Sequence, residues 1–110
     1  MSESIKKAKY FLNLLLDAKT HAIQSRALLD TIDERQLKAV CVILLNLSQQ
    51  DNFPSVSQNS KKLIKSNKKL IKKILNKKLT VKYKFKLISK EYKKILKLLQ
   101  IAKQSLQGLI

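Results

Sequence analysis

The chain contains one glycine, Gly108, and one proline, Pro54, among its 110 residues. A sheet protein needs turn residues every eight to twelve positions or so, and glycine and proline supply many of them. A chain this poor in both is therefore expected to form helices joined by short polar connections. Because 45% of the residues are hydrophobic, they can form one core. We predict an all-α fold, a compact bundle of about five helices in a single domain over residues 1–110.

Apolar residues that recur every three or four positions predict where these helices lie. The predicted ranges are about 3–18, 21–29, 33–47, 57–76 and 81–106. The third helix contains the apolar run 39–45 and is expected to be the buried centre. The sequence Thr31-Ile32-Asp33-Glu34 predicts a capping box at its start, made by Thr31 and Glu34. Thr80 is expected to cap the last helix.

The last predicted helix carries a heptad seam. Its apolar residues are spaced alternately by four and three positions: Val81, Phe85, Ile88, Tyr92, Ile95, Leu99, Ala102 and Leu106. The seam fits packing along the preceding helix and formation of a homo-oligomer equally well. Leu98 and Ile101 lie off the seam, so they are expected to leave apolar surface near the C-terminus for a partner.

Positive charge is concentrated in the second half of the chain. The formal net charge is +17, yet residues 1–60 hold seven basic and six acidic side chains. Residues 61–110 hold seventeen lysines and one acid, Glu91. The domain thus divides into a near-neutral helical part, residues 1–50, and a lysine-rich helical hairpin, residues 57–110. A solvated helix normally alternates glutamate with lysine, whereas lysines alone repel one another, so the excess predicts an anionic partner.

The predicted binding residues lie on both helices of this hairpin. In residues 57–76 the apolar side chains fall in one sector of a helical wheel and the lysines in the opposite sector. The predicted nucleic-acid-binding residues are Lys61, Lys62, Lys65, Lys68, Lys69, Lys72, Lys73, Lys82, Lys86, Lys90, Lys93, Lys94 and Lys97. Lysine suits phosphate contacts and does not read base edges. We therefore expect sequence-independent binding of nucleic acid. DNA is the first candidate for the partner and RNA is the second.

Two other classes of function remain as alternatives. A basic amphipathic helix can lie on an anionic membrane surface, although residues 57–76 lack the tryptophan or phenylalanine usual at such a boundary. A coiled-coil structural adaptor could use the seam and bind an acidic protein partner through its lysines. Sedimentation with anionic vesicles distinguishes the first alternative, and a stable oligomer that depends on Ile88, Tyr92 and Ile95 distinguishes the second.

An enzyme site finds little support in the sequence. Cys41, the single cysteine, lies in the most apolar stretch, where a thiol is normally an inert small hydrophobe. His21, the single histidine, stands at the start of a predicted helix and is expected to be a surface residue. The acidic residues Asp30, Asp33 and Glu34 are explained by the helix dipole more simply than by a cation. We expect no enzyme activity, no cofactor, no metal site and no small-molecule substrate.

The N-terminal sequence and the apolar runs predict an intracellular protein. Met-Ser-Glu-Ser lacks the basic-then-apolar layout of a secretory signal peptide. The longest uninterrupted apolar run, residues 39–45, is far shorter than the roughly 20 residues of a transmembrane helix. The single cysteine excludes an intrachain disulfide.

Residues 26–88 resemble a group of small basic helical proteins encoded by Polinton-like and adinto-like DNA viruses and by their integrated relatives in animal genomes. The likeness is carried by Arg26-Ala27-Leu28-Leu29, Glu34-Arg35-Gln36-Leu37-Lys38-Ala39-Val40, Leu45-Asn46-Leu47, Val56-Ser57 and Lys78-Leu79-Thr80-Val81-Lys82-Tyr83-Lys84. Those proteins often have a glycine pair after their last basic segment. In this chain Glu91-Tyr92 occupies the corresponding place. The resemblance implies a virus-encoded or virus-derived protein that condenses a genome or belongs to a virion core, located in the virion or the host nucleus.

Overall fold

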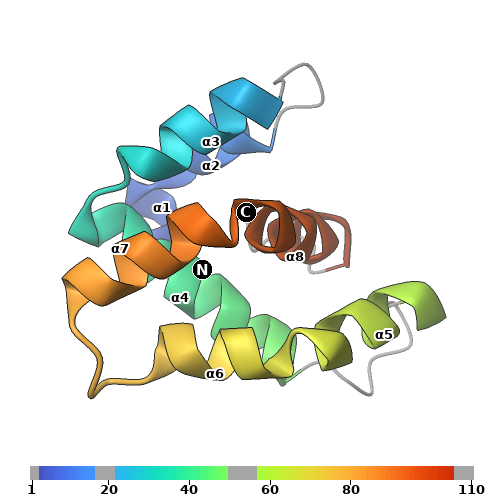
Figure 1. The fold of residues 1–110 in the computed structure, drawn as a ribbon. Helices are drawn as coiled ribbons and strands as arrows, with labels where there is room; N and C mark the ends of the chain where they lie inside the picture. Colours follow the sequence, from blue (N-terminus) through green and yellow to red (C-terminus); the bar gives the residue numbers. More distant parts are fainter. Residues whose placement is uncertain (1–2, 17–21, 50–56, 106–110) are drawn as a thin grey trace.

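The computed structural model describes residues 3–16, 22–49 and 57–105. Within these three ranges the chain forms eight helices and no strand, which confirms the predicted all-α fold (Figure 1). The helices are α1 (Glu3–Lys7), α2 (Lys9–Leu15), α3 (Ala22–Asp30), α4 (Glu34–Ser48), α5 (Gln58–Ser66), α6 (Lys68–Leu75), α7 (Val81–Lys90) and α8 (Tyr92–Ser105).

The eight helices correspond to the five predicted ones, because single residues divide three of these in two. The dividing residues are Ala8, Asn67 and Glu91. Their backbone φ angles lie between −99° and −105° and their ψ angles between 7° and 29°. These angles lie at the edge of the helical region, and the carbonyl of each dividing residue still accepts the next helical hydrogen bond. The helix therefore changes direction there without ending.

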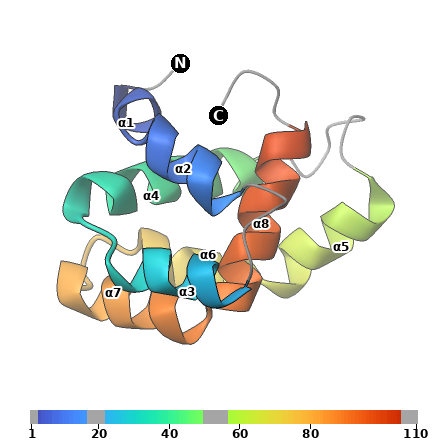
Figure 2. The same cartoon turned by 90° about the horizontal axis from the view of Figure 1, so that it is seen from above.

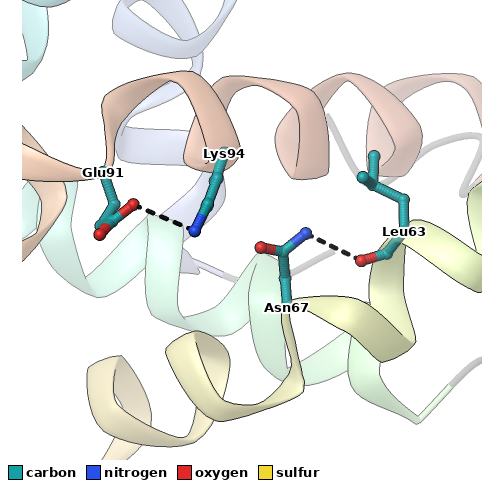
Figure 3. Close-up of polar contacts among 4 residues, drawn as sticks. All are labelled: Leu63, Asn67, Glu91 and Lys94. Carbon is teal, nitrogen blue, oxygen red and sulfur yellow. Dashed lines mark hydrogen bonds and ion pairs between the residues drawn. The ribbon is translucent and has the colours of Figure 1, made fainter.

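Asn67 is the buried polar residue at the break between α5 and α6. Its side chain is 7% exposed, and Nδ2 donates a 2.9 Å hydrogen bond to the carbonyl of Leu63 (Figure 3). Its backbone N–H reaches two carbonyls, those of Leu63 and Ile64, both at 3.2 Å. A side-chain amide that bonds to a carbonyl one turn earlier competes with the helical ladder. The amide of Asn67 is thus satisfied within the core at the point where α5 gives way to α6.

Helix α4 is the centre of the bundle. It contacts α1, α6 and α8, and in both views it lies between α1 and α6 (Figure 1, Figure 2). Its buried residues are Leu37, Ala39, Val40, Ile43, Leu44 and Leu47. The prediction of a buried central helix is thus confirmed, although Leu45 on the same helix is 46% exposed. The radius of gyration of 12.9 Å is close to the ~13 Å expected for a compact domain of this length.

The second half folds back on itself as a helical hairpin. Helix α6 contacts α7, and α5 contacts α8, so the two arms run in opposite directions. Ser57 caps the first arm through Ser60 N–H at 3.2 Å, and Thr80 caps the second through Tyr83 N–H at 3.1 Å. The predicted cap at Thr80 is confirmed. The two arms carry the predicted binding residues and are called the lysine hairpin, residues 57–105, below.

The heptad seam of the second arm is buried mostly within the chain. Seam residues with no exposed surface are Ile88, Ile95, Leu99 and Ala102, whereas Val81 is 38% exposed. Leu106 lies outside the described residues. The prediction of spare apolar surface at Leu98 and Ile101 is wrong, since they are 0% and 6% exposed. Helix α8 contacts both α4 and α5, so more of its circumference is covered than a single seam would provide.

The capping box of α4 lies two residues later than predicted. Asp33 Oδ1 accepts the Gln36 N–H at 2.8 Å, and Gln36 Oε1 accepts the Asp33 N–H at 3.0 Å. The Thr31 hydroxyl instead donates to carbonyls in the last turn of α3. Ile32, which is 7% exposed, lies between the two helices and anchors their connection in the core. The prediction that Thr31 and Glu34 form the box is therefore wrong.

Replacing Asp33 by alanine is expected to lower the free energy of unfolding by ~1 kcal/mol, because loss of the cap leaves an α4 amide without its partner. Thermal denaturation followed by circular dichroism measures this change. The matched control is Thr31→Val, which removes a solvent-exposed hydroxyl and should cost less. A larger loss in Thr31→Val than in Asp33→Ala would contradict the assignment of the cap.

Candidate nucleic-acid interface

The predicted binding lysines lie on the outer surface of the lysine hairpin. Twelve of the thirteen are exposed, and only Lys61, in the first turns of α5, is half-buried. On the opposite side of α5 and α6, Ile64, Ile71 and Ile74 are at most 3% exposed and belong to the core. The apolar sector therefore fixes the first arm against the bundle and leaves its lysines in water.

The turn between the two arms adds lysines that the predicted set omitted. Lys77 and Lys78 are exposed between α6 and α7. The turn is held in place by the Asn76 side chain, whose Oδ1 accepts the Lys78 N–H at 3.0 Å. The signal was present in the sequence, because these residues directly continue the lysine run of the first arm. Lys103, which is also exposed, adds a positive charge near the end of α8.

Few acidic side chains pair with these lysines among the residues that the structure describes. In the described parts of the chain the one salt bridge joins Lys94 Nζ to Glu91 Oε2 at 3.5 Å, at the junction of α7 and α8 (Figure 3). A single exposed ion pair contributes little to stability. The remaining lysines of the hairpin have no carboxylate partner in a salt bridge among the described residues. They repel one another, and a polyanion would relieve this repulsion.

Two charged residues of α3, Asp30 and Arg26, contact side chains of the lysine hairpin. Asp30 accepts a hydrogen bond from the Ser89 hydroxyl of α7. The Arg26 guanidinium lies 5.3 Å from the centre of the Tyr92 ring, a cation–π contact that links α3 to the start of α8. Among the residues that the structure describes, no three histidine, cysteine, aspartate or glutamate side chains cluster as a metal ion requires.

Cys41 lies in the core-facing part of α4. Its thiol is half-buried and donates a 3.9 Å hydrogen bond to the Ile74 carbonyl of α6. Burial raises the pKa of the Cys41 thiol, and the positive charge of Lys84 acts in the opposite direction. At neutral pH the sulfur therefore stays protonated, which is the unreactive form of the group. His21 lies outside the described residues.

No helix in the described ranges combines the length and the apolar character that a membrane crossing requires.

Comparison with protein families, with curated proteins and with solved structures finds no match to this chain.

Proposed function

We propose that the lysine hairpin binds nucleic acid by neutralising phosphates without reading the base sequence, with DNA placed before RNA. The observation that carries this proposal is the row of exposed lysines on both arms, which lack carboxylate partners among the described residues apart from the Lys94–Glu91 pair. Each ammonium group that meets a phosphate releases condensed counterions, and this release provides affinity independent of sequence.

The chemistry of the surface supports backbone contact over base reading. Guanidinium groups give the commonest specific contacts to guanine, but the lysine hairpin contains no arginine. Arg26 lies outside the hairpin and is engaged with the Tyr92 ring. The viral resemblance extends the proposal to a protein that condenses a viral-type genome or forms part of a virion core.

The structure bears on the membrane alternative through the apolar side of the first arm. An amphipathic helix that lies on a bilayer inserts its apolar face into the lipid. In α5 and α6 that face is occupied in packing against the bundle, with Ile71 and Ile74 at 1% and 0% exposure. Membrane insertion of this arm would require the core to open, which favours nucleic acid as the partner.

Affinity for random-sequence duplex DNA is expected to fall steeply as salt rises. If six to ten lysines contact phosphates, the logarithm of the association constant should decrease with the logarithm of salt concentration at a slope of about −5 to −9. Fluorescence anisotropy with a labelled duplex, titrated at several salt concentrations, measures this slope. Duplexes of different base composition should give the same line. Failure to bind even at low salt would contradict the proposal, and anionic vesicles and acidic proteins would be tested next.

A further inference from the structure

Tyr83 is an exposed aromatic residue within the lysine hairpin. It lies in the first turn of α7, where its backbone N–H donates to the Thr80 cap, and it is 44% exposed. The two other aromatic residues of the hairpin, Phe85 and Tyr92, are half-buried and pack against the core. Tyr83 is therefore the aromatic ring of this surface that a ligand can reach.

The surroundings of Tyr83 combine an apolar floor with two positive charges. Tyr83, Lys86, Leu87 and Lys90 line a shallow hollow of about 170 Å³. Positions three, four and seven residues apart share one face of a helix, so the ring and both lysines project on the same side of α7. Lys86 and Lys90 are exposed, and neither forms a salt bridge within the described residues. The backbone of Tyr83 is held by the Thr80 cap, so the main chain need not become ordered when a ligand binds.

We infer that Tyr83 is a stacking platform for an unpaired base, with Lys86 and Lys90 holding the adjacent phosphates. The inference rests on the proposed function and adds the class of nucleic acid that this face prefers. In a duplex the faces of the bases are covered by their neighbours, whereas a single strand offers each base face to an aromatic ring. Because every base has such a face, stacking tolerates any sequence, in agreement with a surface built from lysine.

The experiment compares one random-sequence oligonucleotide as a single strand and as a duplex, using the full chain and its variants. Tyr83→Leu should weaken single-strand binding by about 5- to 150-fold, the range for loss of one base–aromatic stack. The affinity of the Tyr83→Leu variant for the duplex should not change, because the lysines that contact phosphates remain. Tyr83→Phe should keep the single-strand affinity, because stacking needs the ring and not the hydroxyl.

The matched control is Tyr10→Leu. Tyr10 is 82% exposed but lies on α2, outside the lysine hairpin, so its loss should affect neither form of the oligonucleotide. Circular dichroism checks that each variant keeps its helices. Unchanged single-strand affinity in Tyr83→Leu would overturn the stacking inference, and so would an equal loss for both forms. If the full chain binds a duplex with a steep salt slope, the proposed function survives either of these results. If it binds neither form, both proposals fall together.

Discussion

Simultaneous replacement of Lys65, Lys69 and Lys72 by glutamate is expected to remove most of the affinity for duplex DNA at physiological salt. These three lysines are exposed on α5 and α6, on the side away from the core. Each lost phosphate contact should reduce the magnitude of the salt slope by about one, so three should reduce it by ~3. Counterion release alone then predicts roughly a 100-fold weaker complex, and repulsion between the new carboxylates and the phosphates increases the loss.

The fold is expected to survive this change. Glutamates at positions 65, 69 and 72 would each lie four residues from a remaining lysine, namely Lys61, Lys73 and Lys68. Such pairs stabilise a helix by about 0.2–0.5 kcal/mol, where the lysines now repel one another. Circular dichroism and thermal denaturation should therefore show an unchanged or slightly higher helix stability. Loss of DNA binding could then be attributed to the surface itself.

The matched control places the same charge change on the near-neutral half of the molecule. Lys6, Lys7 and Lys9 are exposed on α1 and α2, outside the lysine hairpin. Their replacement by glutamate alters the net charge by an equal amount and should weaken binding far less. Equal losses in both triple variants would mean that binding follows total charge and not this surface. Unchanged affinity in the hairpin variant, with its fold intact, would remove the first arm from the site.

The sequence predicted the helices well because apolar spacing reports which side of a helix is buried. It did not predict where a helix changes direction. Asn67 stands within a regular lysine and leucine pattern, and the other two breaks fall at Ala8 and Glu91, so the three positions share no residue type that would mark them in the sequence. The capping box was predicted two residues too early, because the sequence does not show which hydrogen bonds a side chain already makes. Thr31 has a suitable side chain for a cap, but its hydroxyl is already used at the end of α3.

The lysines of the candidate site could be predicted from the sequence, because their charge alone defines them. A lysine must stay solvated, so the exposure of the predicted lysines follows from their number and from the apolar sector opposite them. Tyr83 was not predictable in this way. Val81, Tyr83 and Phe85 alternate with lysines at the start of α7. The heptad seam includes Val81 and Phe85 and leaves Tyr83 off it, yet both Val81 and Tyr83 are exposed, so the spacing alone does not report their exposure. Their exposure depends on how α7 is rotated against α3 and α6, which is set by tertiary contacts.

Replacing Ile95 by alanine is expected to lower the free energy of unfolding by about 2–5 kcal/mol, the usual cost of truncating a buried aliphatic side chain to alanine. Ile95 has no exposed surface and lies on α8, which packs against α4, α5 and α7. Domains of this kind are stable by only about 5–15 kcal/mol, so the change removes a large share of the total. The midpoint of thermal unfolding should fall by roughly 10–20 °C.

The same variant distinguishes packing within one chain from assembly through the heptad seam. Val81 belongs to the seam but is 38% exposed, so Val81→Ala should cost far less than Ile95→Ala if the seam is used within the chain. In a homo-oligomer held by the seam, an exposed seam residue would become buried, and both variants would be costly. The unfolding midpoint would then also rise with protein concentration, because association stabilises by mass action. A midpoint independent of concentration, with Val81→Ala nearly neutral, is the result expected when α8 is covered by its own bundle.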